Sequence, residues 1–170
     1  MRAALLALAF LVLALPADAQ VGTTPVNARE PIEIVADALE VQQYKRTAIF
    51  TGNVNANQGT MVMRADTLKV TYSGGAEQAN AISQLDATGR VFLSTPAETA
   101  QGAAANYDVG TGIITLTGGV VLTRGESVLR GERVVLNLAT GVSRIEGAPA
   151  GGGDGRVRAV VVPGQAGAAP

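Results

Sequence analysis

The chain has 170 residues, of which 13 are basic and 14 acidic, and it contains no histidine, cysteine or tryptophan. Without histidine and cysteine, thiol catalysis, Ser-His-Asp relays and most metal sites are excluded, so we expect neither an enzyme nor a cofactor. The net charge of −1 argues against nucleic-acid binding, which usually requires a basic patch. Glycine is frequent, at 21 residues, while aromatic residues make up only 4%. This composition favours a small β-rich binding or structural protein.

Residues 1–19 have the features of a secretory signal peptide. Arg2 provides a short basic region, residues 3–15 are an unbroken apolar run, and Ala17-Asp18-Ala19 carries the small residues that a signal peptidase recognises. A transmembrane anchor is the weaker alternative, because this apolar run is shorter than the roughly 20 residues needed to cross a bilayer. We therefore expect export with cleavage after Ala19, followed by a flexible lead-in over residues 20–30.

From residue 31 to residue 163 the chain alternates apolar and polar residues in short runs broken by Gly, Asn and Asp. A period of two residues is the signature of half-buried β-strands, and no stretch of this region sustains a helical period. We therefore predict one all-β domain over residues 31–163 and a disordered tail over residues 164–170.

An internal repeat underlies this alternation. Ala36-Asp37 is echoed by Ala65-Asp66, and the apolar parity switches at each pair, as it does at a β-bulge. Each repeat also has a second strand with a glycine at the inward parity of its apolar neighbours, where glycine marks a sharp bend. These glycines are Gly52, Gly89, Gly118 and Gly147. The repeat predicts bent antiparallel strands stacked into a jelly roll or a V-shaped folded sheet with an open apolar groove.

The apolar parity identifies residues that would line this groove. They are Ile34, Phe50, Val54, Met61, Met63, Leu68, Val70 and Leu116. Mid-sized side chains with few aromatics suit a flexible groove, and methionine offers an adaptable surface to variable apolar chains. The residues by themselves leave open whether this interior is a ligand groove or an ordinary packed core.

Several short motifs occur in a fixed order along the chain. They are Pro31-Ile32-Glu33-Ile34, Phe50-Thr51-Gly52-Asn53-Val54, Gln58-Gly59-Thr60, Leu116-Thr117-Gly118-Gly119-Val120 and Val160-Val161-Val162-Pro163. In this order they resemble the OstA-like (LptA) family of periplasmic lipopolysaccharide-transport proteins, over nearly all of the chain after the signal peptide. The resemblance implies a β-jelly roll in the periplasm whose interior holds lipopolysaccharide acyl chains, with lipid contacts at Ile32, Tyr107 and Val109.

The resemblance also implies partners. The cargo would be the lipid A part of lipopolysaccharide, copies would associate head to tail, LptC would join the N-terminal edge and LptD the C-terminal edge. The terminal segment 157–162 carries one internal charge, which suits pairing with a strand of a partner. The glycine-rich segment 150–155 departs from the family pattern just before this last strand.

Two alternatives belong to other functional classes. The first is an adaptor, a β-sandwich with a filled core that docks cell-envelope assembly proteins and carries no lipid. The second is an enzyme acting on envelope glycans, which is disfavoured because pairs such as Glu30/Glu33 lack a constellation that separates an acid from a base. Arg64, Arg130 and Arg133 beside the predicted bends could contact lipid phosphates, although a solvated outer face is the ordinary place for such arginines.

Overall fold

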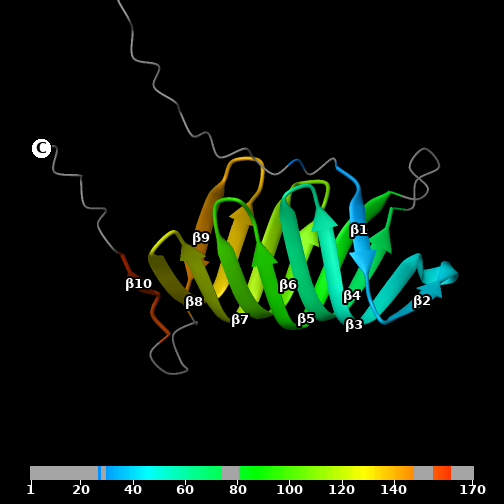
Figure 1. The fold of residues 1–170 in the computed structure, drawn as a ribbon, viewed down its shortest axis with the longest axis horizontal. Helices are drawn as coiled ribbons and strands as arrows, with labels where there is room; N and C mark the ends of the chain where they lie inside the picture. Colours follow the sequence, from blue (N-terminus) through cyan, green and yellow to red (C-terminus); the bar gives the residue numbers. More distant parts are fainter. Residues whose placement is uncertain (1–26, 28–29, 74–80, 148–154, 162–170) are drawn as a thin grey trace, which may run out of the picture.

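The alternating residues form ten β-strands in the computed structural model, which describes residues 27, 30–73, 81–147 and 155–161. The strands are β1 (Ile32–Val35), β2 (Ala38–Gln42), β3 (Thr47–Gln58), β4 (Met61–Tyr72), β5 (Ile82–Ser94), β6 (Thr99–Asp108), β7 (Ile113–Arg124), β8 (Ser127–Asn137), β9 (Val142–Glu146) and β10 (Arg158–Val160), with a 3-10 turn η1 (Gln43–Lys45) after β2. Every strand pair is antiparallel (Figure 1). The all-β prediction is confirmed. The predicted signal peptide, most of the lead-in and the tail lie outside the described residues.

The sheet is open, and its described strands end in an edge at each end of the molecule (Figure 1). Strands β3 to β8 pair in sequence order as a meander. Beyond β3, β2 pairs with its first half and β1 with its second half, and these two strands form the N-terminal edge. Beyond β8, β10 pairs with its first half and β9 with its second half, and they form the C-terminal edge.

Each long strand bends near its middle. The pairing register shifts between Thr51 and Val54, and equivalent shifts recur across the meander up to β8. On β3, β5 and β7 the shift coincides with two consecutive left-handed residues, Gly52–Asn53, Gly89–Arg90 and Gly118–Gly119. Glycine adopts this backbone at no steric cost, and a bulge of this kind bends a strand. The bends predicted at these three glycines are confirmed.

Gly147 behaves differently from the other three glycines. It follows the end of β9 at Glu146, and strand pairing to β8 resumes only at β10. A Cβ atom on Gly147 would meet the carbonyl oxygen of Gly155, so the chain turns out of the ladder here instead of bending through it. The prediction of a fourth bent strand is wrong, because a glycine-rich stretch offers few side chains to hold a continuous strand against the core.

The bends divide the sheet into two arms. The β1 arm comprises β1, residues 54–58, 61–65, 91–94, 99–102, 120–124 and 127–131, and β10; the β2 arm comprises β2, residues 47–51, 67–72, 82–88, 104–108, 113–117 and 133–137, and β9. Alternate residues of both arms form one apolar core, in which Val70, Ile114 and Leu116 are fully buried. Hairpin turns lie at the arm ends away from the bends, and we call this side the mouth.

Candidate functional site

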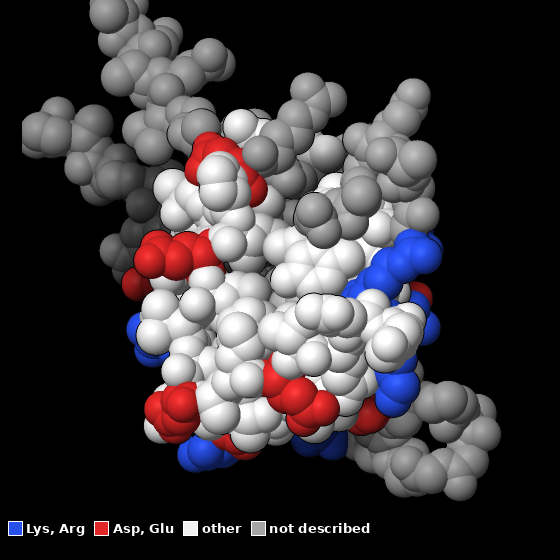
Figure 2. Space-filling view, turned by 90° about the vertical axis from the view of Figure 1, so that its right-hand side faces the viewer, with Lys and Arg blue, Asp and Glu red and all other residues white. Residues whose placement is uncertain are grey.

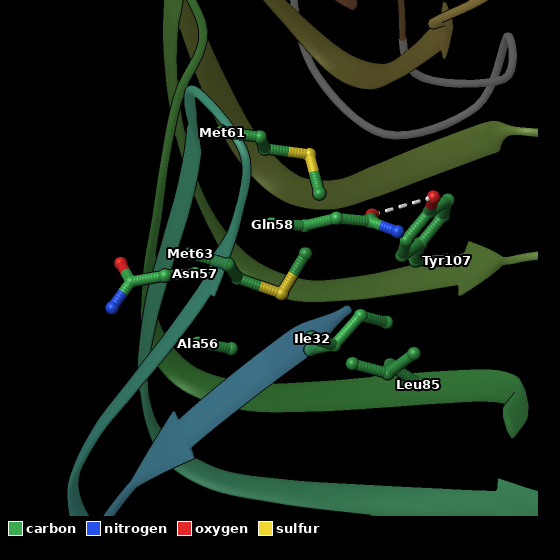
Figure 3. Close-up of a pocket in the computed structure, with 8 residues that line it drawn as sticks. All are labelled: Ile32, Ala56, Asn57, Gln58, Met61, Met63, Leu85 and Tyr107. Carbon is green, nitrogen blue, oxygen red and sulfur yellow. Dashed lines mark hydrogen bonds between the residues drawn. The ribbon is translucent and has the colours of Figure 1, made fainter. Parts of the chain in front are cut away.

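A small cavity lies between the two arms near the mouth (Figure 3). The β1 arm contributes the side chains of Ile32, Ala56, Gln58, Met61 and Met63, and the β2 arm contributes Leu85 and Tyr107, while Asn57 points away. The cavity measures about 10 Å³, which is close to the least that a single water molecule needs. The arms are therefore in contact, and the interior is filled by the side chains of the protein.

One polar link crosses the interior beside this cavity. The Tyr107 hydroxyl donates a hydrogen bond of 2.9 Å to Gln58 Oε1, and Gln58 Nε2 donates one of 3.0 Å to the carbonyl oxygen of Glu30. Gln58 is 1% exposed, and among the described residues it is the one polar residue that is buried as a whole residue. Burial raises the pKa of Tyr107, which keeps its hydroxyl protonated and able to donate. Because Gln58 and Tyr107 belong to different arms, this bond closes the mouth at the N-terminal half.

A second polar link closes the mouth further along the sheet. Ser143 Oγ on β9 donates a hydrogen bond of 2.6 Å to Glu98 Oε1, and Arg124 Nη2 donates one of 3.0 Å to Ser143 Oγ. Arg124 also pairs with Glu98 Oε2 at 2.6 Å. The Glu98 side chain is only 7% exposed, so these bonds are screened little by water. Glu98 and Arg124 lie at the end of the β1 arm and Ser143 lies on the β2 arm.

The structure brings four of the predicted groove residues together around the cavity. These are Ile32, Met61, Met63 and Tyr107. The other seven belong to the same core without bordering the cavity, and they are Ile34, Phe50, Val54, Leu68, Val70, Val109 and Leu116. Apolar parity therefore placed the predicted residues on the inner faces of the arms.

Sequence reasoning missed three residues of the cavity, Ala56, Gln58 and Leu85. Ala56 and Gln58 continue the parity of Val54 along β3, so the alternation of every second residue already indicates that their side chains face inward. Gln58 was overlooked because a search for apolar side chains passes over an amide, and only its partner across the interior explains its burial.

The two edges differ in charge. Over residues 30–46 the N-terminal edge carries four acidic residues, Glu30, Glu33, Asp37 and Glu40, and two basic residues, Lys45 and Arg46. The C-terminal edge carries Arg144, Arg156 and Arg158 against one acidic residue, Glu146, in its described part. Both edges also expose large apolar side chains, namely Val35, Leu39, Val41 and Tyr44 at one and Val142, Val157, Val160 and Val161 at the other. Figure 2 looks at the N-terminal end, where uncharged side chains cover most of the surface and acidic and basic side chains are both present.

The structure is an open, bent, antiparallel sheet whose two arms enclose an apolar interior. The chain is therefore an all-β protein of the open, bent-sheet class. A family profile described as LptA/(LptD N-terminal domain) LPS transport protein matches residues 33–142. The chain therefore belongs to this family of lipopolysaccharide-transport proteins, which is a transport family and not an enzyme family.

Two known proteins are similar to this chain, one in sequence and one in structure. The chain is 33% identical over 93 residues to an uncharacterized protein of Rhizobium meliloti (strain 1021), a match that covers 52% of this chain and 50% of that protein. The chain thus spans about half the length of this curated relative. The crystal structure of LptH, the LptA-homologous periplasmic component of the lipopolysaccharide transport device of Pseudomonas aeruginosa, matches with a TM-score of 0.70 at 18% identity. It covers 82% of this chain and 100% of that chain, and it confirms the fold.

Two further observations concern the described part of the chain. No group of three or more His, Cys, Asp or Glu residues there is placed to hold a metal ion. In the same residues, no helix has the length and apolar character needed to cross a bilayer.

Proposed function

We propose that this protein binds the acyl chains of lipopolysaccharide between its two arms and forms part of a periplasmic bridge from the inner to the outer membrane. The observation that carries the proposal is the continuous apolar lining of both arms, held shut at the mouth by polar links. Membership of a lipopolysaccharide-transport family supports the cargo. The likeness to LptH, a periplasmic component, supports the compartment.

Acyl chains would enter by parting the arms at the mouth. Three hydrogen bonds cross the mouth, one between neutral groups and two that involve a charged group. Breaking them costs about 5 kcal/mol, taking about 1 kcal/mol for a neutral hydrogen bond and about 2 kcal/mol for one to a charged group. Each acyl methylene buried contributes about 0.8 kcal/mol. About six methylenes between the arms therefore offset the loss of both links, and the apolar contacts between the arms are replaced by contacts with lipid.

The inward-facing side chains would make the lipid contacts. The proposed set is Ile32, Ile34, Phe50, Val54, Met61, Met63, Leu68, Val70, Tyr107, Val109 and Leu116. Their burial in one core and the flexibility of the two methionines support this assignment.

Photo-crosslinking tests the proposal directly. A photoreactive amino acid at Ile32, Tyr107 or Val109 should capture lipopolysaccharide when the protein is purified from cells or incubated with the lipid. Lys69 and Thr115 lie on the β2 arm at the outward parity, so a probe at either position is a matched control that should give background labelling. Capture at the controls alone would refute an interior site.

The two edges are the proposed docking surfaces. We assign LptC to the N-terminal edge, LptD to the C-terminal edge, and head-to-tail pairing to copies of this chain. Unpaired edge strands with exposed apolar side chains support strand pairing with a partner. An acidic edge at one end and a basic edge at the other favour head-to-tail contact over contact between like edges, because like charges facing each other are destabilising.

An adaptor that carries no lipid is the second candidate function, and the filled interior favours it. In that case the same edges would dock envelope proteins while the core stays closed. Native mass spectrometry separates the two functions, because a carrier retains lipid of defined mass when it is released gently from the cell. If the measured mass is that of the protein alone, even after incubation with lipopolysaccharide, the protein is an adaptor.

A further inference from the structure

The outer face of the β1 arm has a hollow that the lipid-binding interior does not use. Asn55 on β3 is paired with Arg64 on β4, and Arg64 is paired with Phe92 on β5. Their inward neighbours Val54 and Val91 are buried in the core, so these three side chains lie side by side on the opposite, outward face. Together with residues at the bend they border a hollow of about 550 Å³.

Arg64 gives this hollow a positive charge, because the other arginine at the hollow, Arg90, is paired with Asp66. The Arg64 guanidinium lies 5.9 Å from the centre of the Phe92 ring, and no carboxylate of the described residues lies within ion-pair distance of it. Arg90 is fixed at the rim by a two-pronged contact with Asp66, with Nη2 at 2.6 Å and Nε at 3.1 Å from Oδ1 and Nε at 3.2 Å from Oδ2. Arg64 is thus a cation held over an aromatic ring with its charge not neutralised.

A polar atom in the same hollow lacks a partner. The Oδ1 atom of Asn55 is shielded from solvent and accepts no hydrogen bond. Such an atom costs about 1–3 kcal/mol until a donor reaches it. Hydrogen bonding to Arg90 lowers the pKa of Asp66, so Asp66 is a carboxylate and a second acceptor at the rim.

We propose that this hollow binds a phosphorylated or otherwise acidic amino sugar. Arg64 would take the anionic group with two parallel hydrogen bonds, a sugar hydroxyl would donate to Asn55 Oδ1, and the Phe92 ring would carry the apolar face of the sugar. A simple phosphate ion needs no acceptors and no aromatic platform, so this combination favours a saccharide. Both a lipopolysaccharide headgroup and a cell-wall glycan present this chemistry.

The inference goes beyond the proposed function, because the hollow lies outside the interior that would hold acyl chains. A probe without acyl chains therefore tests it independently. We suggest titrating the full chain with a bis-phosphorylated glucosamine disaccharide and following binding by calorimetry and amide NMR shifts. The unphosphorylated disaccharide and inorganic phosphate serve as comparison ligands, and an N-acetylmuramic acid disaccharide represents the cell wall.

Four variants make the test specific. Arg64→Ala and Asn55→Leu should each weaken binding of the phosphorylated disaccharide at least tenfold. Lys69→Ala removes the same charge from the outward face of the β2 arm, outside the hollow, and should leave the affinity unchanged. Arg64→Lys keeps the positive charge but lacks the planar guanidinium that forms two parallel hydrogen bonds, so it should lose part of the affinity. Circular dichroism and thermal unfolding check that each variant is folded.

The outcomes decide the proposal. Tighter binding of the phosphorylated disaccharide than of the muramic acid disaccharide identifies the lipopolysaccharide headgroup as the source, and the reverse order identifies the cell wall. Equal affinity of Arg64→Ala and Lys69→Ala would overturn the site. Binding of inorganic phosphate as tightly as the disaccharide would overturn its assignment to a saccharide. Failure of lipid capture in the photo-crosslinking experiment would leave this result unaffected.

Discussion

At the scale of single residues, the contact between Gln58 and Tyr107 shows how a polar pair can specify an apolar interior. A buried amide costs free energy unless its hydrogen bonds are made. Here the amide oxygen of Gln58 accepts from Tyr107 and its nitrogen donates to Glu30. The pair fixes the distance between two strands that are not neighbours in the sheet, which apolar contacts alone would leave adjustable.

The pair can be tested by a double-mutant cycle. Tyr107→Phe removes the hydrogen bond that the buried Gln58 amide oxygen accepts from the Tyr107 hydroxyl, so we expect a loss of about 1–3 kcal/mol in the free energy of unfolding, measured by urea denaturation. Gln58→Leu combined with Tyr107→Phe replaces both partners by apolar groups and should recover most of that loss. Strict additivity of the two single changes would mean that the bond does not hold the arms together.

Asp86 predicts a pH dependence. Burial raises the pKa of Asp86, but hydrogen bonds from Gln84, Asn106 and Lys69 outweigh burial and lower it below its ordinary value. A carboxyl whose pKa is lower in the folded state stabilises the fold above the unfolded pKa of about 3.9, and this stability is lost as the pH falls through the folded pKa. Urea midpoints of the wild-type protein should therefore fall below about pH 4. Asp86→Asn should reduce that decline, and an unchanged decline would exclude Asp86 as its source.

At the scale of the strands, the recurring bend is a device of three parts. A left-handed glycine lies on β3 and on β5, a second left-handed residue follows it, and a carboxylate of the neighbouring strand binds that residue. Asn53 Nδ2 donates to Asp37 Oδ2 at 2.8 Å, and Arg90 pairs with Asp66 at 2.6 Å. The Ala-Asp repeat of the sequence therefore places its acid where the second bend residue can reach it.

Substitution of the bend glycine tests this device. In Gly89→Ala the new Cβ would meet the Asp66 carboxylate, whereas at Gly125, also left-handed, nothing lies within 4 Å. Gly125→Ala should therefore cost only the left-handed penalty of about 1–2 kcal/mol. Gly89→Ala should cost more than that in thermal or urea unfolding, because it adds a steric clash at the bend. Equal losses for the two variants would show that the bend tolerates a side chain.

The strands also show how much of the fold can be predicted from the sequence. Alternation located the strands because one face of each is buried, and the parity switch at Asp37 and Asp66 located bulges, because a bulge must restore the inward face. Local patterns could not reveal that Gln58 meets Tyr107, because the two residues are far apart in the chain. Nor could they show the break after Glu146, which depends on the backbone of a different segment, at Gly155.

At the scale of the whole molecule, the charge difference between the edges predicts how copies associate. An acidic N-terminal edge and a basic C-terminal edge attract each other. Salt at physiological ionic strength screens exposed charges that lie more than about 8 Å apart, and more salt shortens this distance. Sedimentation over a concentration series should therefore show oligomers that grow with concentration and dissociate at high salt. Arg158→Glu should reduce assembly, whereas Lys69→Glu on the outer face is a charge-matched control. A strictly monomeric profile at low salt would contradict edge-to-edge assembly.

The two arms of the fold must part if lipid enters at the mouth. A cross-link between the arms tests this, because the chain has no cysteine and a pair of introduced cysteines is the sole site of reaction. In the variant Gln58→Cys/Tyr107→Cys, a short bismaleimide would tie the two arms together. We expect the tied protein to lose at least tenfold in lipopolysaccharide capture, whereas the same variant without cross-linker should capture lipid at least as well as wild type, because its polar link is absent. A matched control is Asn57→Cys/Val62→Cys, which ties two paired strands of one arm and should leave capture unchanged.

A second pair separates closure of the mouth from obstruction by the cross-linker itself. Glu98→Cys/Ser143→Cys would tie the arms at the other polar link, away from the cavity beside Ile32, so the linker would not occupy that cavity. If both tied variants fail to capture lipid, parting of the arms is the step that admits it. If the tied proteins bind as well as the untied ones, lipid would have to enter along the interior from one of the two edges, with the mouth closed throughout.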